Sequence, residues 1–213
     1  MDEQIMVTCR DIRCDSSGKD IIKQIARSES RPIRTQQIFL EARGLGKAES
    51  EAGRLEPELA QRLGAVGLIG RASGIARDLR VDYLWEPYDR LNPNVVTQTA
   101  GDVAARVQVR FDEIFESLRL CRALLNDPST GPLRMTVPPA PSDCYGFGLI
   151  EGWRGPVWIA LEAGPRGTIR RCHAHDSSWQ NWPLLEYAIL GNIVPDFPLI
   201  NKSFNLSYSG HDG

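Results

Sequence analysis

The feature that most constrains the fold is a long stretch of helical periodicity between Gly101 and Pro128. Apolar residues recur there mostly at intervals of three or four positions, as on one face of an α-helix: Val103, Val107, Phe111, Ile114, Phe115, Leu118, Cys121 and Leu125. Asp102 stands near the start, where a carboxylate is favourable, and Asp127-Pro128 ends the pattern. The sequence therefore predicts one long amphipathic helix.

Shorter elements are predicted before this helix. Residues 56–63 read as a short helix, and GAVGLIGRASGI at residues 64–75 supplies small residues where backbones can approach closely. Between residues 77 and 94, Pro87 and Pro93 exclude a continuous helix and favour extended or turning backbone. We expect this part to be packed but irregular.

After the helix, short apolar runs between Gly146 and Cys172 are separated by turns that begin at Trp153 and Gly164. This pattern predicts a small antiparallel β meander. The fold class is therefore mainly α with a small antiparallel meander, an α+β arrangement.

Ser177 is a candidate cap for a further helix over residues 178–190, in which Pro183 is tolerated only within the first turn or so. Four apolar residues of that helix recur at helical spacing and are expected to pack on the core: Trp179, Trp182, Leu185 and Ile189. The last residues, 192–213, read as irregular.

Charge and composition narrow the function. The net charge is -2 with acids and bases mixed along the chain, so we expect no nucleic-acid partner. The most apolar stretch, residues 184–194, falls short of the roughly 20 residues that cross a bilayer, so no direct membrane span is expected. The N-terminus lacks a secretory pattern, and five scattered cysteines fit reduced thiols. The expected location is the cytoplasm.

Five segments, in order and at their separations, resemble one family: RASGIARDLR (71–80), PYDR (87–90), GDVAARVQVR (101–110), EGWRG (151–155) and the C-terminal segment. It is the hydrogenase-like large subunit of energy-converting [NiFe]-hydrogenases, formate hydrogenlyase and quinone-reducing NADH dehydrogenase. The ending DFPLINKSFNLSY is most similar to the formate hydrogenlyase type. The resemblance covers about residues 53–213 and implies a partial [NiFe]-hydrogenase large-subunit-like fold.

Residues 1–52 do not resemble the first half of that family, and we assign them no function. Whether this segment is well ordered is left open. Cys9 and Cys14 have the wrong spacing for the upstream hydrogenase cysteines. A fragment, a truncated subunit and one half of a split protein all remain open.

The family's hydrogenases end in Ser-Leu-Asp-Pro-Cys-x-x-Cys, whose thiolates hold nickel and bridge it to iron. On this chain the pattern falls on residues 203–210, with Ser207 and Gly210 in the cysteine positions and Asn205 in place of the aspartate. A serine hydroxyl stays neutral near pH 7 and is a hard ligand, whereas glycine has no side chain. We therefore expect no metal bound by this chain.

The neutral groups that remain, at Asn205, Ser207, Tyr208 and Gly210, could form one wall of a pocket for a flat, mostly apolar ligand such as a quinone. An ordinary C-terminal tail is the alternative. By resemblance, Arg71, Asp78 and Arg80 would face the cavity or the partner subunit. A salt-bridged structural turn is equally open for them.

Two other groups have plainer interpretations. Cys172, His173 and His175 give weak support for a metal site, because alternation along a strand points Cys172 and His173 to opposite faces. Glu151 and Arg154 flank a tight turn and read as an exposed pair that shapes the hairpin.

The resemblance implies a subunit of a membrane-associated electron-transfer oxidoreductase of the NADH-quinone dehydrogenase or formate hydrogenlyase type, not active alone. Expected partners are an iron–sulfur small subunit, which carries a tetranuclear cluster, and other subunits of the complex. Quinone binding and NAD binding are expected of such a complex, which would be peripheral on the cytoplasmic face of the inner membrane. The alternative is a non-catalytic truncated remnant, or an assembly or interaction module.

Overall fold

The computed structural model describes residues 32–34, 36, 51–126 and 140–211. The chain divides into two compact units, one formed by residues 1–48 and 111–130 and the other by residues 49–110 and 131–213. The predicted candidate residues all lie in the second unit. The predictions for residues 1–50, Cys9 and Cys14 included, fall almost wholly outside the described residues.

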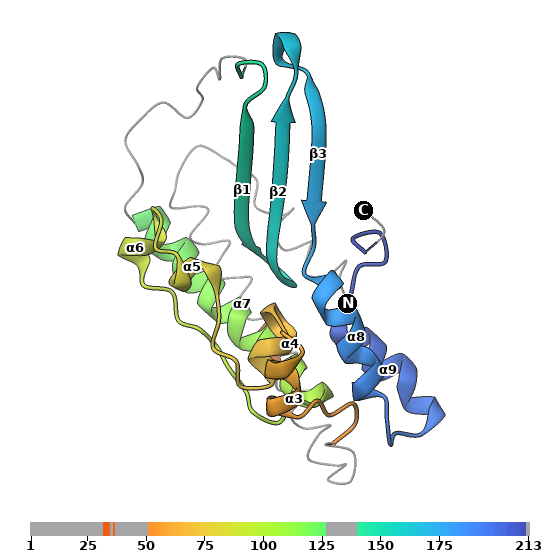
Figure 1. Cartoon of the computed structure of the whole chain (residues 1–213). Helices are drawn as coiled ribbons and strands as arrows, with labels where there is room; N and C mark the ends of the chain where they lie inside the picture. The colour runs from red at the N-terminus through yellow and green to blue at the C-terminus, as the bar shows by residue number, and fades with distance from the viewer. Residues whose placement is uncertain (1–31, 35, 37–50, 127–139, 212–213) are drawn as a thin grey trace. The chain divides into compact units, whose positions relative to one another are not determined.

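The described elements agree with the predicted fold class, helices with one three-stranded antiparallel sheet (Figure 1). In chain order they are α3 (Pro57–Arg62), α4 (Gly67–Ala72), α5 (Leu79–Asp82), α6 (Tyr88–Leu91), α7 (Val103–Asn126), β1 (Tyr145–Gly152), β2 (Gly155–Ala163), η1 (Pro165–Gly167), β3 (Ile169–His175), α8 (Ser178–Ala188), η2 (Val194–Asp196) and α9 (Phe197–Phe204). No helix in the described part of the chain is long and apolar enough to cross a membrane.

The long helix is confirmed as α7. Asp102 caps it, because its Oδ1 accepts a hydrogen bond from the Ala105 N–H at 2.6 Å. Within the second unit, the buried face of α7 differs from the predicted apolar stripe, because Val107 is only half-buried. Ala105 and Val109 are buried there instead, in one cluster with Leu68 and Ala72 of α4. Small side chains allow α4 and α7 to pack closely, which a count of large apolar residues overlooks.

The sheet is the predicted meander, in the order β1-β2-β3. Trp158 of β2 pairs with Leu149 on one side and His175 on the other. Because alternate side chains point to opposite faces, Trp158, His173 and His175 share one face while Cys172 lies on the other. The Trp158 and His175 rings stack with centroids 4.8 Å apart.

Helix α8 is also confirmed, with two corrections. Ser177 holds the N-cap position but its side chain makes no capping bond; Asp176 Oδ1 accepts from the Ser178 N–H at 2.8 Å instead. Pro183 lies inside the helix rather than in its first turn. It removes the N–H that would otherwise pair with the carbonyl of Trp179.

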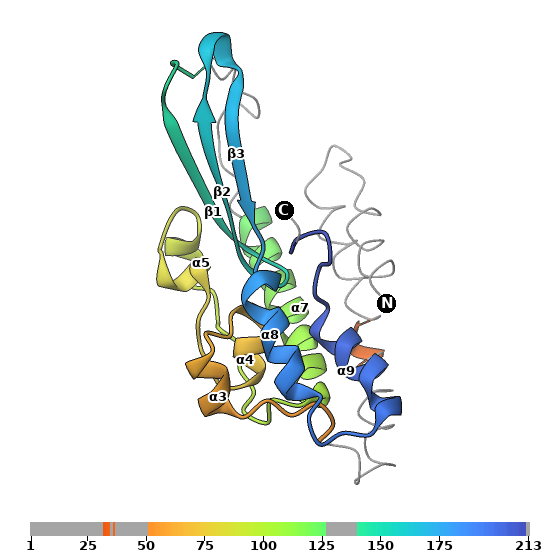
Figure 2. The ribbon, with the colours of Figure 1, turned by 45° about the vertical axis from the view of Figure 1, so that its right-hand side comes forward.

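The prediction of irregular backbone at the C-terminus was wrong for residues 194–204, which form η2 and α9. The two prolines of this segment, Pro195 and Pro198, lie at helix starts, where proline is tolerated. Asn205 ends α9 in the left-handed conformation, φ 54° and ψ 41°. Figure 2 shows α8 and α9 lying next to each other, as does Figure 1.

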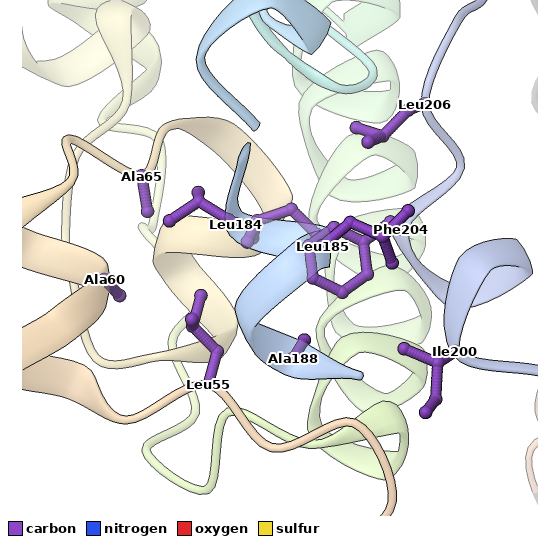
Figure 3. Close-up of a cluster of buried hydrophobic side chains, with 10 residues drawn as sticks. Leu55, Ala60, Ala65, Leu184, Leu185, Ala188, Ile200, Phe204 and Leu206 are labelled. Atoms are coloured by element: carbon purple, nitrogen blue, oxygen red, sulfur yellow. The ribbon is translucent and has the colours of Figure 1, made fainter. Parts of the chain in front are cut away.

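The main hydrophobic cluster of the second unit joins α3, α4, α8 and α9, and Figure 3 shows Leu184, Leu185 and Ala188 of α8 within it. Its buried members are Leu55, Ala60, Ala65, Ile69, Leu184, Leu185, Ala188, Ile200, Phe204 and Leu206. Trp182 and Ile189 pack against it partly buried, as predicted. Trp179 is 37% exposed and lies among His173, His175 and His211, so its predicted place in the core was wrong.

Candidate functional site at the β1–β2 turn

The β1–β2 turn lies against the start of α4, and two glycines make this contact possible. A Cβ atom at Gly67 would lie 2.0 Å from the Arg154 carbonyl oxygen, and one at Gly155 would lie 2.8 Å from the Gly67 Cα. Both glycines have positive φ, +57° and +136°, which L-residues avoid. The predicted close approach within residues 64–75 is confirmed, and it fixes the turn against α4.

On one side of this turn, a network of buried charges joins α4, α5 and β1. Arg71 Nη1 donates to Glu151 Oε1 at 2.8 Å and lies 3.8 Å from Asp78 Oδ2. Arg80 binds Asp78 through two nitrogens, at 2.9 Å and 2.6 Å. The side chains of Arg71, Asp78 and Glu151 are 2–4% exposed. The structure thus brings the predicted Arg71, Asp78 and Arg80 together as a salt-bridged group.

The two carboxylates of this network differ in their ease of protonation. Burial acts to raise the pKa of Asp78, but the hydrogen bonds and charge of Arg80, with the charge of Arg71, outweigh it and lower the pKa below its usual value. Burial also raises the pKa of Glu151, and there the attraction of Arg71 only partly offsets it while Asp78 repels. Asp78 is therefore firmly ionised, whereas Glu151 takes up a proton more readily.

The prediction that Glu151 and Arg154 form an exposed pair was wrong. Glu151 points into the buried network, where its Oε2 also accepts from the Leu79 N–H at 3.2 Å. Arg154 points to the other side of the turn, and its Nε donates to the carbonyl oxygen of Asn205. The turn therefore connects the charge network with the C-terminal segment.

The C-terminal segment is held on the N-terminal part of α8. The Ser207 N–H donates to Ser178 Oγ at 3.0 Å, and the Trp179 indole N–H donates to the Gly210 carbonyl at 2.6 Å. The Gly210 N–H donates to Ser207 Oγ at 3.0 Å. The two positions that resemble metal-binding cysteines are thus hydrogen-bonded to each other in a closed turn.

These residues do not fit a nickel–iron centre. The Ser207 hydroxyl already binds the Gly210 amide, and a Cβ at Gly210 would lie 3.0 Å from both Ser207 Cβ and Asp176 Cβ. Across residues 51–126 and 140–211, no group of three or more His, Cys, Asp or Glu could hold a metal ion. The donor set offers hydroxyl and amide groups where nickel needs soft thiolates.

The other predicted pocket residues have clear structural settings. Asn205 occupies the left-handed C-cap of α9, a position that asparagine tolerates better than most residues. Tyr208 is 67% exposed, its ring centroid lies 5.0 Å from that of Trp182, and its hydroxyl accepts from Asn201 Nδ2 at 3.3 Å. The segment presents neutral hydrogen-bonding groups beside aromatic rings.

Three residues at this site were given other roles from the sequence. Glu151 and Arg154 stand in the EGWRG segment that carried the resemblance, so that segment was the available signal. Trp179 gave no signal, because its bond to Gly210 joins residues 31 positions apart.

The sequence of this chain matches one family of known proteins. The family model described as the respiratory-chain NADH dehydrogenase 49 kDa subunit matches residues 10–144. Formate hydrogenlyase subunit 5 of Escherichia coli is 30% identical over 204 residues, which cover 94% of this chain and 36% of the relative. Hydrogenase-4 component G of the same organism is 34% identical, covering 73% of this chain and 28% of the relative.

An NADH-quinone oxidoreductase subunit of Salinispora tropica is 34% identical, covering 79% of this chain and 43% of the relative. This chain thus spans less than half the length of these curated relatives. The same fold occurs in a chain of the membrane-bound sulfane sulfur reductase, an archaeal respiratory membrane complex whose structure is solved. The TM-score is 0.82 and the sequence identity 22%, and the match covers 95% of this chain and 57% of that one. The chain belongs to the hydrogenase-like large-subunit family, which includes the 49 kDa subunit of respiratory-chain NADH dehydrogenase.

Proposed function

We propose that this chain is a subunit of a membrane-associated electron-transfer oxidoreductase of the NADH-quinone dehydrogenase or formate hydrogenlyase type, working without a nickel–iron centre. The observation that carries the proposal is the hydrogen-bonded turn of Ser207 and Gly210, held between α8 and Arg154 in a chain of this family. The turn keeps the family's site ordered while removing the thiolates.

The chain supplies one part of a [NiFe]-hydrogenase large-subunit-like fold, and other chains complete the site. The family match begins at residue 10, so residues 10–52 belong to this part as well, which the sequence pattern did not predict. Relatives named as subunits of a formate hydrogenlyase, a hydrogenase and an NADH-quinone oxidoreductase support a role within an assembly. The partners are an iron–sulfur small subunit and further subunits at the cytoplasmic face of the membrane, and NAD binding belongs to another subunit.

The substrate of the assembled site is a quinone. Asn205, Ser207 and Tyr208 offer neutral polar groups, and the Tyr208 ring lies beside that of Trp182. This combination suits a flat ligand with polar tips. Arg154 adds a positive charge beside Asn205, where it favours a reduced, negatively charged quinone. Electrons pass between the partner's cluster and the quinone, and this chain binds and orients the substrate.

The test is to purify the tagged chain from its native host under mild conditions. We expect a stoichiometric iron–sulfur subunit, a cluster signal by electron paramagnetic resonance, and quinone-dependent turnover. Ser207→Ala should lower that turnover with the complex intact, whereas the matched control Ser142→Ala, at an exposed residue outside the C-terminal segment, should not. A lone chain without a partner or activity would refute the proposal and favour a non-catalytic assembly module.

A further inference from the structure

Strand β1 is an edge of the three-stranded sheet, and its outer side is unpaired. The strand order β1-β2-β3 gives β1 a single neighbour, β2 (Figures 1 and 2). Within the described part of the chain, residues 145–150 form backbone hydrogen bonds with β2 alone. In an antiparallel pair only alternate residues direct their N–H and C=O groups to the neighbouring strand. The other residues of this stretch therefore present free donors and acceptors along the edge.

The two edges of the sheet differ in how they are protected. Edge strand β3 carries Arg170 and Arg171, and a bulge interrupts its pairing with β2 at Glu162 and Ala163; charges and bulges both discourage a further strand. Residues 145–150 of β1 have the sequence YGFGLI, without a charge or a proline, and their register with β2 is regular. An apolar, unbroken edge of this kind is a template for pairing with another chain.

Two glycines leave a gap on one face of β1. Gly146 lies opposite Leu161 of β2, and Gly148 lies opposite Ile159. A Cβ atom at either glycine would meet nothing within 4 Å. On the other side of β2, the same two residues lie opposite only a cysteine and an alanine of β3. Leu161 and Ile159 are consequently 38% and 41% exposed between small neighbours.

The gap has the size of a side chain from a fourth strand. A strand paired with the outer side of β1 would lie about 4.8 Å from it. A large apolar side chain of that strand can lean over a glycine onto the next strand, where it would cover Ile159 or Leu161. Glycine inside a strand often marks such a close approach by another backbone. The backbone edge and the gap therefore suit the same occupant.

The glycines also argue against a second copy of this chain. In a two-fold antiparallel pair of β1 strands, even-numbered residues would lie opposite even-numbered residues. Gly146, Gly148 and Gly152 would then meet one another or Ile150 within the strand, and most of the gap would stay open. Lipid offers no row of donors and acceptors, and open sheet edges do not occur in the hydrocarbon of a membrane. A strand of a different protein meets both requirements.

We propose that β1 binds an extended segment of a different subunit as a fourth strand, and that large apolar side chains of this segment fill the gap over Gly146 and Gly148. Backbone hydrogen bonds along the edge supply affinity, and the side chains over the glycines supply specificity. This inference goes beyond the proposed function, because it specifies how one partner is bound and holds for any reaction of the complex.

The first test uses a photo-crosslinking amino acid at Tyr145 or at Phe147 of the full chain in its native host. These residues are 81% and 66% exposed. They share one face of β1, so the two probes should reach residues of one partner peptide that are two positions apart. The same amino acid at Leu190, which is 70% exposed just after α8, is the control and should not reach that peptide. Crosslinks only to lipid or to a second copy, no crosslink, or contacts three or four positions apart as on a helix would overturn the inference.

The second test fills the gap from this chain's own side. Neither Gly146 nor Gly148 has a positive φ, so a double variant with Gly146→Val and Gly148→Val should keep or raise the urea midpoint of the purified chain. The valines take the space of the partner's side chains, and copurification of the crosslinked subunit should fall about tenfold or more. Ala174→Val, at an exposed position of the same face on β3, is the matched control and should leave the partner bound. Undiminished copurification with the double variant contradicts the inference.

Amide hydrogen exchange reports strand addition without any variant. In the purified chain, the amides of residues 145–150 that are not bonded to β2 should exchange rapidly, and in the native complex they should be protected. Equal exchange in both states would remove the fourth strand. If that complex still reduced quinone, the proposed function would stand. Protection by a protein outside any oxidoreductase would instead support the fourth strand and remove the function.

Discussion

Replacing Arg71 with methionine should expose how the buried charge network contributes to stability. Methionine keeps much of the volume but removes the hydrogen bond to Glu151 and the charge 3.8 Å from Asp78. Asp78 keeps Arg80, whereas Glu151, with its side chain 4% exposed, keeps the Leu79 amide but loses its close positive partner. Removing one partner of a buried ion pair costs about 3–5 kcal/mol, so we expect a loss of that size.

The loss should depend on pH, and its direction follows from the pKa of Glu151. Burial already raises that pKa above its ordinary value of 4.5, and removing Arg71 raises it further. A carboxyl with a raised pKa in the folded state stabilises the fold most when protonated, and this contribution is lost as pH rises through the folded-state pKa. The Arg71→Met variant should therefore be closest to wild type in acid and weakest above neutral pH.

Urea unfolding of the purified chain at pH 5 and pH 8, followed by circular dichroism, measures both effects. Arg77→Met is the matched control, because Arg77 is 74% exposed and its pair with Asp82 is worth under about 1 kcal/mol. Combining Arg71→Met with Glu151→Leu should recover much of the stability, since no unpaired carboxylate remains. A loss below about 1 kcal/mol at pH 8, or an equal loss at both pH values, would refute the reasoning.

Three further outcomes are expected. Arg106→Met should lower the free energy of unfolding by about 2–4 kcal/mol. Arg106 is 0% exposed and donates hydrogen bonds to two backbone carbonyls and a hydroxyl, which the variant would leave without this donor. Burial lowers the pKa of Arg106 to about 9, so the guanidinium stays charged at neutral pH. Gly67→Ala should cost at least about 3 kcal/mol in urea unfolding, while Gly64→Ala, also at positive φ but with nothing within 4 Å, should cost only about 1–2 kcal/mol. Elemental analysis of the native complex should find no nickel, and stoichiometric nickel would contradict our assignment.

Much of the fold follows from local patterns in the sequence. The period of α7, the turns of the meander and the short α3 each rest on neighbouring residues, so a single sequence suffices to predict them. Helix α9 was not predicted, although the fixed φ of a proline at a helix start is favourable.

The candidate site was only partly predictable because its bonds join distant positions. Glu151 reaches Arg71 across 80 residues, and the burial that raises its pKa depends on the Gly67 contact with the turn. A sequence pattern shows two charged residues around a turn, and a pair between them is then the simplest expectation. Only tertiary packing decides that Glu151 turns inward while Arg154 turns to Asn205.

The hydrogen bond between the Gly210 amide and Ser207 Oγ changes what drives the end of the chain to fold. In a metal site the ligands must lose protons and the ion must be available before the segment closes, so folding is linked to both pH and metal supply. Here a neutral hydroxyl and backbone amides close the turn, and neither changes protonation near neutral pH. The C-terminal segment should therefore reach its native conformation during ordinary chain folding and keep it in the presence of chelators.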